Sequence, residues 1–375
     1  TPHVSWGSPM DFGSFFASVP DPRAPNARHD LCELLLISFA AVLCGAEGCQ
    51  DMADFGEAKE QSLRKFLRLR HGIPSHDTFS RIFRSLDPVA FEAAFLKFMA
   101  AFAARLSGVV GAAGQVIAID GKSLSGAFEA GARATPLHLV TAWGAENRLV
   151  LGQCRAPGRS ETKGALELVA MLDLEDATVT ADALHGNRKM AKAIRQRGGH
   201  YVLALKGNRG PLYHETVALL GNVVADTIDG PQLDHGRIET RQAAVLAVPD
   251  GWDQKFKFHG LVAVARIDAV RRLANAEERH SRYFVLSRML SAADVLATVR
   301  AYWGIENRQH WVLDVVFNED RARSRKDNAA QNLALLRRLA LNLLRSDGLK
   351  ASIRRKIKRA GWVEDYLFTL LAQMR

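Results

Sequence analysis

The chain has 375 residues, of which 48% are hydrophobic, so it can bury a full core and is long enough for two or three domains. Its 50 Lys and Arg residues exceed its 40 Asp and Glu residues, and the net charge of +10 fits a polyanionic partner as well as a merely basic protein. The longest apolar run, Leu31 to Cys44, contains Glu33 and is too short to span a bilayer, which excludes an integral membrane protein.

The N-terminal part of the chain predicts an extended arm followed by helices. Prolines are frequent in residues 1–28, which indicates an arm, and no charged segment precedes a signal-like stretch, so we expect a cytoplasmic protein. Residues 29–110 predict a helical domain, whose first helix Asp30 can cap and Gly45 can end. The cysteines show neither CxxC pairs nor Cys/His metal spacing, so we expect reduced thiols and no zinc site.

Residues 71–88 (HGIPSHDTFSRIFRSLDP) predict a basic helix that follows another helical stretch. Phe79, Ile82, Phe83 and Leu86 recur in it at helical spacing. A helix, a short turn and a basic helix are compatible with a helix-turn-helix that enters the major groove of DNA. The pattern alone favours the alternative, an ordinary helical bundle, because helix pairs are common.

From residue 115 onward, the spacing of the apolar residues changes from helical to strand-like. The segments read as three strands, a helix, a strand, a helix and a strand, with the turn Gly144–Asn147 between the second and third strands. This order predicts a mixed α/β sheet with helices packed on it. Residues 225–290 add strand-like stretches, and from Ala292 the chain is helical and ends in a basic tail.

Two acids directly follow apolar strands in this region. Asp120 comes after VIAI, in a strand that we expect to end there in a polar turn, and Asp182 comes after ATVTA. Carboxylates at the carboxyl ends of strands point into the crevice where open α/β sheets bind ligands, and Mg²⁺ prefers such oxygens. For each Asp, the alternative is a turn or capping residue. No GxSxG or Walker A sequence is present, so neither a serine hydrolase nor a P-loop enzyme is expected.

A third acid is expected from a helix packed near the edge of the sheet. Within residues 302–320 (YWGIENRQHWVLDVVFNED), spacing alone leaves four candidates open: Glu306, Asp314, Glu319 and Asp320. Glu306, His310 and Asp314 share one helix face, which is poor core material because buried acids need partners or metals. The alternative is a structural network in which Glu306 pairs with His310 or Arg308.

Several long segments occur in the chain in a familiar order: IAIDGKSLSGAF, LHLVTAWGAENRLVLGQ, TVTADALHGNRKMAKAI and YWGIENRQHWVLDVVFNEDRARSRK. Through these and others, from about residue 20 to 345, the chain resembles bacterial insertion-sequence transposases of the H-repeat-associated (ISAs-type) family, in the DDE superfamily. The resemblance implies an α/β fold with an RNase H-like catalytic core, a helical N-terminal domain and a β-rich insertion. It also implies a triad of Asp120, Asp182 and Glu306 that is both catalytic and metal-binding, with two Mg²⁺ ions that Mn²⁺ can replace.

Pattern and resemblance together define the expected domains and partners. We expect an arm at 1–28, a helical DNA-binding and association domain at 29–110, a catalytic domain at 111–345 with an insertion at about 215–290, and a basic tail at 346–375. The implied partners are double-stranded DNA, as transposon end and as target, and further copies of the chain in a dimer or larger complex. The alternatives are an RNase H-like nuclease that cuts without joining and a domesticated DNA-binding relative.

A set of basic and polar side chains is expected to contact DNA: Lys122, His185, Lys206, Arg308, His310, Arg323, Arg325 and Lys326. For each lysine, a solvated surface position is an equal alternative, and a structural hydrogen bond is the alternative for His310. Related transposases carry basic residues before and after the Glu, where this chain has Tyr302 and Leu313–Asp314. The basic partner of Glu306 therefore stays open among Arg308, Arg323, Arg325 and Lys326. A second departure is Asn187–Arg188, where a Gln is expected nearby.

Overall fold

The computed structural model describes residues 16–107, 114–129, 132–156, 158, 160–207, 210–234, 237–273 and 276–374. Its strands are β1 (Val116–Glu129), β2 (Ala132–Gly144), β3 (Leu149–Arg155), β4 (Thr178–Ala181), β5 (His200–Leu205), β6 (Thr227–Asp234), β7 (Arg237–Ala247), β8 (Ala263–Leu273) and β9 (Ala276–Leu286). The helices of its first half are α2 (Leu31–Leu43), α3 (Cys49–Leu63), α4 (His76–Ser85), α5 (Pro88–Ser107), α6 (Glu161–Met171), α7 (Arg188–Gln196), α8 (Pro211–Leu220) and α9 (Trp252–Lys255). The later ones are α10 (Ala292–Gly304), the π-helix η3 (Ile305–His310), α11 (Trp311–Val315), the 3-10 helix η4 (Glu319–Arg321), α12 (Ala329–Ser346), α13 (Ile353–Trp362) and α14 (Glu364–Ala372).

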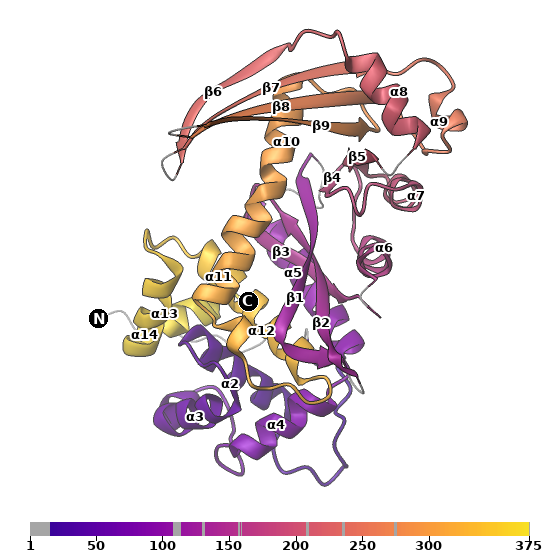
Figure 1. Cartoon of the computed structure of the whole chain (residues 1–375). Coiled ribbons are helices and arrows are strands. Elements are labelled where there is room, and N and C mark those ends of the chain that lie inside the picture. Colours follow the sequence, from indigo (N-terminus) through magenta and orange to yellow (C-terminus); the bar gives the residue numbers. More distant parts are fainter. Residues whose placement is uncertain are drawn as a thin grey trace.

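The strands form one nine-stranded sheet in the order β3-β2-β1-β4-β5-β9-β8-β7-β6 (Figure 1). β1, β2 and β3 pair antiparallel, whereas β4 and β5 run parallel to β1. Helices α6 and α7 connect these strands, as the alternating pattern predicts. This half of the sheet is the expected RNase H-like core, so the prediction of the fold class is confirmed.

β1 differs from the sequence prediction in one respect. The strand was expected to end in a polar turn after Asp120, but it continues to Glu129. The reason is β2, which supplies antiparallel partners for Gly121 to Leu124 and, after an irregularity, for Phe128 and Glu129. The neighbour on the other side, β4, ends beside Ile119. Asp120 therefore lies where the parallel part of the sheet ends, although its own strand goes on.

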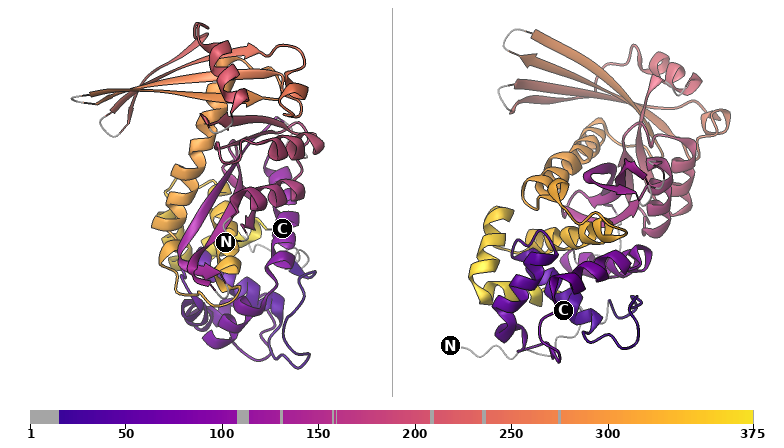
Figure 2. Two further views of the ribbon diagram at one scale, coloured as in Figure 1. Left: turned by 45° about the vertical axis from the view of Figure 1, so that its right-hand side comes forward. Right: turned by 60° about the horizontal axis from the view of Figure 1, so that its bottom comes forward.

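The strand-rich region predicted at 225–290 forms β6 to β9. The hairpins β6–β7 and β8–β9 pair locally, and β9 then pairs antiparallel with β5, from Val202↔Leu286 to Leu205↔Tyr283. These strands thus extend the core sheet instead of forming a separate one. Figure 1 shows them as a curved platform beside α10, and the left view of Figure 2 shows the far ends of the platform projecting away from the core.

Helices cover both faces of the sheet. On one face, α6, α7 and α8 pack on apolar residues of the central strands, among them Ile117 and Ile119 of β1. On the other face, α10 packs on β5, β7, β8 and β9, while α5 and α12 pack near Trp143 and Val150. Because successive strand residues face opposite ways, Asp120 and Lys122 point toward the side of α10 and α12.

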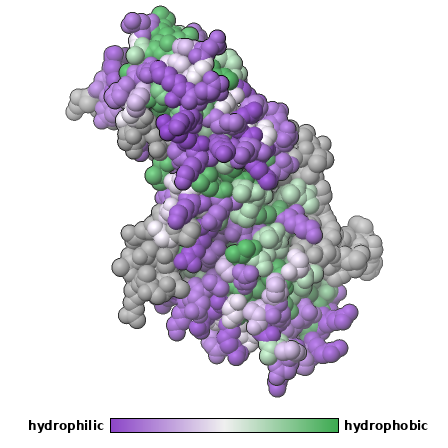
Figure 3. All heavy atoms as spheres, turned by 90° about the vertical axis from the view of Figure 1, so that its right-hand side faces the viewer, coloured by the Kyte–Doolittle hydropathy of each residue, from purple (hydrophilic) through white to green (hydrophobic). Residues whose placement is uncertain are grey.

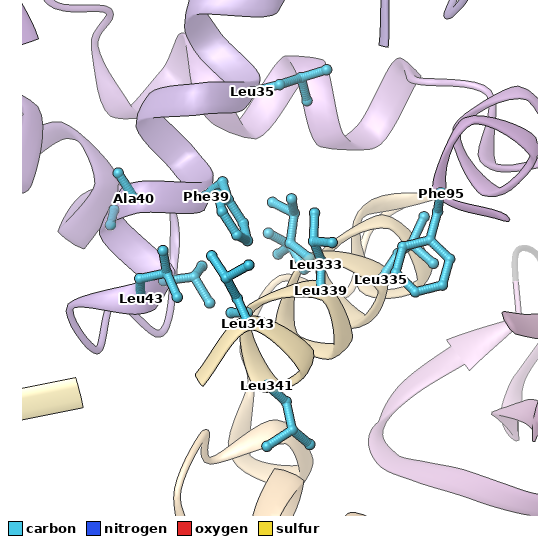
Figure 4. Close-up of a cluster of buried hydrophobic side chains, with 14 of the residues drawn as sticks. Leu35, Phe39, Ala40, Leu43, Phe95, Leu333, Leu335, Leu339, Leu341 and Leu343 are labelled. Carbon is cyan, nitrogen blue, oxygen red and sulfur yellow. The ribbon is translucent and has the colours of Figure 1, made fainter. Parts of the chain in front are cut away.

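The N-terminal helices and α12 share a single core, as Figure 4 shows. The labelled side chains come from α2 (Leu35, Phe39, Ala40, Leu43), α5 (Phe95) and α12 (Leu333, Leu335, Leu339, Leu341, Leu343). α12 belongs by sequence to the stretch expected as the catalytic domain, yet it lies among α2, α4 and α5. The helical part of the chain is therefore built from both ends of the sequence.

α4 and its neighbours form a bundle, the simpler of the two interpretations. Phe79, Ile82, Phe83 and Leu86 are all buried, as their spacing predicts. Asp30 caps α2 by accepting a hydrogen bond from the Glu33 N–H. The arm expected at 1–28 lies outside the described residues up to position 15, and Phe16 packs against Phe91 of α5.

Residues 346–375 were expected as a basic tail, but the described part of this segment forms α13 and α14. Lys356 of the basic run is buried and donates hydrogen bonds to the carbonyls of Leu344 and Asp347. Arg354, Arg355, Lys358 and Arg359 remain exposed on α13. The helices form because Ile357, Ala360, Leu367 and Leu370 bury an apolar face against the helical core.

Hydrophilic side chains predominate on the face shown in Figure 3, where the hydrophobic ones form separate groups. Of the helices in the described part of the chain, none is long and apolar enough to cross a membrane.

Candidate active site

The three predicted acids approach one another at the end of the parallel strands. Asp120 lies in β1, Asp182 directly follows the neighbouring strand β4, and Glu306 lies in η3, the continuation of α10. The negative charges of Glu306 and Asp182 both act on Asp120 and raise the pKa of its carboxyl group. Asp182 and Glu306 line the same cavity, of about 370 Å³. The strand order and the position of the helix thus bring together three acids, of which the first and the last are 186 residues apart in sequence.

The carboxyl group of Asp120 is largely buried, and two side chains from the helical segment around Glu306 lie against it. Tyr302 donates a hydrogen bond of 3.0 Å to Oδ1, and Nδ1 of His310 lies 3.7 Å from Oδ2. Burial, reinforced by the neighbouring acids, raises the pKa of Asp120 to about 6. Burial also lowers the pKa of His310 to about 4, with help from Arg338 and Lys122, so His310 is neutral at pH 7. The hydrogen bond from Tyr302 therefore orients Asp120, and the neutral His310 packs beside it without neutralising it.

The cavity is lined by both acidic and basic side chains, Asp182 and Glu306 together with Lys206 and Arg282. Lys206 directly follows β5 and is exposed, which agrees with a DNA contact and with a solvated surface position alike. Phe284, Tyr302 and Trp303 supply an aromatic lining. An anion with a polar surface, such as a phosphodiester, suits a cavity of this composition.

Lys122 does not reach this cavity, because three carboxylates already surround its ammonium group. Nζ lies 2.5 Å from Asp314, 2.9 Å from Asp320 and 3.5 Å from Glu319. The side chain is only 7% exposed. The other three acids of the 302–320 stretch are therefore engaged with Lys122, which leaves Glu306 as the member of that group beside Asp120 and Asp182.

His185 is also withdrawn from solvent. It is fully buried, and its Nε2 lies 3.6 Å from Oε2 of Glu161. Glu161 accepts a 2.5 Å contact from Nε2 of His138, and these two histidines lower the pKa of Glu161 to about 2. Since Asp182 accepts the backbone N–H groups of Leu184 and His185, this cluster supports the turn that carries Asp182. The geometry favours a structural role for His185.

The remaining expected DNA contacts lie apart from the acids. Arg308 is exposed and lines a second cavity, of about 320 Å³, with Trp143 and Arg300. Arg323, Arg325 and Lys326 are exposed in the segment between η4 and α12, where Arg325 lies close to Gly126. Asn187, noted as a departure, caps α7 by accepting the N–H groups of Lys189 and Met190.

Comparisons with known proteins were made by family model and by sequence. A family model described as a transposase DDE domain matches residues 111–343, and one described as DDE_Tnp_1-associated matches residues 14–99. The chain belongs to the DDE transposase family. It is 34% identical to the "Putative transposase YncI" of Escherichia coli O157:H7, over 96% of this chain and 93% of the relative. It is also 34% identical to the "H repeat-associated putative transposase YhhI" of Escherichia coli (strain K12), over 94% and 96%.

Among solved structures, a piggyBac transposase synaptic complex with hairpin DNA is 12% identical to this chain with a TM-score of 0.44, over 98% of this chain and 81% of the other. The family membership rests on the sequence relatives and the family models, and it confirms the resemblance seen in the motifs.

In this transposase, the helix that carries Glu306 is irregular. α10 ends at Gly304 and continues as the π-helix Ile305–His310, a form often found at functional sites. The Trp143 ring of β2 packs directly on Gly304, and a Cβ atom at that position would come within 2.7 Å of it. The change of helix type therefore begins where the sheet presses most closely on the helix, two residues before Glu306.

Gly304→Ala is accordingly expected to destabilise the transposase by about 1 to 3 kcal/mol, because neither the Trp143 ring nor the helix backbone can yield cheaply. Gly221→Ala is the control, since its Cβ would make only ordinary contacts of 3.4 Å or more in a right-handed helical backbone. Urea unfolding followed by circular dichroism measures both. Equal stability of the two variants would show that the contact between Gly304 and Trp143 is not tight.

Several residues of the site were not found from the sequence. Tyr302 was noted only as a departure from the family pattern, although it stands four residues before Glu306 and hence on the same helix face. Glu161 and His138 carry no recognisable spacing. Arg282 lies in the strand-rich region, more than 20 residues from any predicted site residue, and only the pairing of β9 with β5 brings it to the cavity.

Proposed function

We propose that this chain is a DNA transposase that frees the 3′ ends of an insertion sequence and joins them to target DNA, using two divalent cations. The observation that carries the proposal is the convergence of Asp120, Asp182 and Glu306 beside a cavity that Lys206 and Arg282 also line. Two cations of this kind suit in-line phosphoryl transfer, because they act on both the attacking and the leaving oxygen. We further propose that the reaction takes place in the bacterial cytoplasm, at the nucleoid.

The chemistry of the three acids fits Mg²⁺, with Mn²⁺ as a substitute. All three offer carboxylate oxygens, which hard cations prefer. Asp120 lies between two like charges, a costly arrangement that cations would relieve. In the described part of the chain, no group of three or more acid, His or Cys side chains is gathered tightly enough to hold one ion. Two ions would each need only a pair of these carboxylates, and the residues that would hold them are Asp120 with Asp182 and Asp120 with Glu306.

The cations, when bound, would supply Lewis acidity at the phosphorus and lower the pKa of an attacking water or hydroxyl. Tyr302 would hold the Asp120 carboxylate in place for that role through its hydrogen bond. Lys206 would contact a non-bridging phosphate oxygen in the cavity. In the first step, water displaces the 3′-oxygen at the transposon end. In the second, the freed 3′-hydroxyl displaces an oxygen of the target strand, so that each step forms one P–O bond and breaks one.

Duplex DNA is the proposed partner, and two copies of the chain or more would bring both ends together. Exposed basic residues that can bind its phosphates lie in two groups outside the cavity: Arg323, Arg325 and Lys326 before α12, and Arg354, Arg355, Lys358 and Arg359 on α13. Such contacts carry little sequence information. The first alternative, a nuclease that does not join DNA, shares the three acids. The second, a domesticated DNA-binding relative, has no need of them.

A strand-transfer assay separates these functions. A short duplex with a pre-cut 3′-hydroxyl end, taken from the inverted repeat beside the gene, is incubated with the purified chain, Mg²⁺ and a supercoiled plasmid. Joined products are expected. Cleavage of an uncut end without any joined product would support the nuclease instead, and DNA binding without cleavage would support the domesticated relative.

Glu306→Gln is expected to lower Mg²⁺-dependent end cleavage by at least roughly 100-fold, since it removes one ligand charge while keeping the size of the side chain. Binding of the end DNA in EDTA is expected to stay as in the wild type. Glu57→Gln, which removes the same charge from an exposed position on α3, is the control. Cleavage that survives in Glu306→Gln would remove Glu306 from the triad.

A further inference from the structure

We infer that Arg282, a residue of the β6–β9 extension, binds the DNA phosphodiester at the cavity of the three acids. The inference rests on the proposed function, because the anion it names is the substrate of that reaction. It gives the extension a direct part in the active site. It also names a basic partner for Glu306 that lies outside the four candidates left open by the sequence.

The first observation is the position of Arg282 next to Lys206. β5 and β9 pair antiparallel, and their register ends with Leu205 opposite Tyr283. β5 ends there, and the next residue on each of the two segments, Lys206 and Arg282, lines the same cavity. Like charges on neighbouring strands repel, so this arrangement favours an anion in the cavity.

The second observation is that neither cation is neutralised within the protein. Both side chains are exposed, and among the described residues neither has a carboxylate within ion-pair distance. This contrasts with the other arginines of the extension. Arg241 pairs with Glu239 at 2.8 Å, Arg272 with Glu277 at 3.1 Å, and Arg279 with Glu277 at 2.7 Å. Arg282, the arginine of this set that lines the cavity, is therefore also the one whose charge no carboxylate of the described residues neutralises.

The third observation is the aromatic support of Arg282. Its guanidinium carbon lies 5.4 Å from the centroid of the Trp303 ring, and that of Arg241 lies 4.5 Å from the same ring. A cation over an aromatic face is attracted by the ring, which restricts the long arginine side chain to one region. Trp303 stands three residues before Glu306, so the ring restricts Arg282 to the neighbourhood of that helix.

Together these features describe a site for a singly charged phosphodiester. Asp182, Glu306, Lys206 and Arg282 all line this one cavity. A guanidinium can donate two parallel hydrogen bonds to two phosphate oxygens, which positions the phosphorus as well as attracting it. The acids would hold the cations, while Lys206 and Arg282 would bind the phosphodiester in the same cavity.

The test compares Arg282→Gln, Arg282→Lys and the control Arg279→Gln, a neighbouring exposed arginine of β9. Binding of the duplex end is measured in EDTA between roughly 50 and 200 mM salt, and cleavage is measured with Mg²⁺. Arg282→Gln is expected to weaken binding by roughly 10-fold and to lower the slope of log affinity against log salt by about 1. Arg282→Lys is expected to restore the salt slope, because the slope depends on the charge. It is expected to restore only part of the cleavage rate, because lysine cannot donate bidentate hydrogen bonds to the phosphate.

The outcomes separate this inference from the proposed function. If the wild type cleaves DNA and Arg282→Gln has the same salt slope and cleavage rate, the role of Arg282 is overturned and the proposed function stands. An equal loss in Arg279→Gln does the same, because any surface charge would then suffice. A wild-type protein that binds but never cleaves overturns the proposed function, while the salt slope still supports or rejects Arg282. Thermal unfolding of Arg282→Gln at the wild-type temperature excludes misfolding as the cause.

Discussion

Replacing Asp120 by asparagine is expected to abolish DNA cleavage and, in the absence of metal, to stabilise the folded chain by roughly 3 kcal/mol at pH 7. The loss of activity follows from the proposed role of Asp120 as the acid shared by both cations. The gain in stability follows from its surroundings. Burial and the charges of Glu306 and Asp182 raise its pKa from 3.8 to about 6, so the ionised form is disfavoured in the folded state.

The raised pKa of Asp120 determines how the stability of the wild type changes with pH. Below pH 3.8, Asp120 is protonated in both the folded and the unfolded state, so the wild type and Asp120→Asn differ little. Between pH 3.8 and about 6, the unfolded state ionises first, and the wild type loses stability as the pH rises. Above about 6 the cost is complete. The stability difference between the two proteins should therefore be small near pH 4 and largest at neutral pH.

Urea unfolding at several pH values in EDTA measures this difference, with Asp250→Asn as the control at an exposed turn. Adding Mg²⁺ should then stabilise the wild type and not Asp120→Asn, because ligand binding favours only the folded state that can hold it. A pH-independent difference, or a variant less stable than the wild type at pH 7, would mean that Asp120 is not under electrostatic strain. Such strain is what a site prepared for cations would store.

Local patterns in the sequence were enough to position the two aspartates. β4 is a short, fully buried strand followed at once by Asp182, and its placement needs no distant information. The prediction that Asp120 follows an apolar run was correct, but the prediction that its strand ends there was wrong, because β1 continues to Glu129. The residues after it are polar because they alternate between two occupied faces, with Lys122 directed to the acids of η4 and Ser123 to His138. Only the pairing with β2 shows this.

Long-range contacts explain most of what the sequence could not predict. The extension joins the core sheet through the pairing of Val202 with Leu286, and no local pattern reports such a pairing. α12 reads as an ordinary apolar helix, so nothing in its sequence tells that it lies against α2 and α4. The π-helix at Glu306 begins directly after Gly304, where Trp143 packs, and Trp143 stands some 160 residues earlier in the chain.

Lys122→Met is expected to destabilise the transposase by about 3 kcal/mol, because it leaves the half-buried Asp314 and Asp320 without this cation and the buried Glu319 with Arg338 alone. Asp314, Asp320 and Glu319 all lie within 3.5 Å of the Lys122 ammonium group. These acids raise the pKa of Lys122 above its ordinary value of 10.5, in spite of burial. The stabilisation is therefore fully present below pH 10.5 and is lost only as the pH rises through the folded-state pKa.

Two further variants isolate the cause. Lys192→Met removes an exposed lysine from α7 and is expected to leave stability unchanged within about 0.5 kcal/mol. The double variant Lys122→Met, Asp314→Asn should recover part of the loss, because it removes one of the stranded charges, and the recovery measures the coupling between the two residues. Additive losses in the double variant would show that Lys122 and Asp314 do not interact.

The same experiment decides between the two roles considered for Lys122. A phosphate contact predicts that Lys122→Met folds as stably as the wild type but binds DNA with a smaller salt slope. The ion-pair network predicts the reverse, a large loss of stability with little change of slope at a temperature where the variant is still folded. Lys122 stands two residues after Asp120, and Asp314 eight residues after Glu306. Their ion pair thus joins the strand that carries one acid to the helix that carries another, so its loss should lower cleavage even in the folded variant.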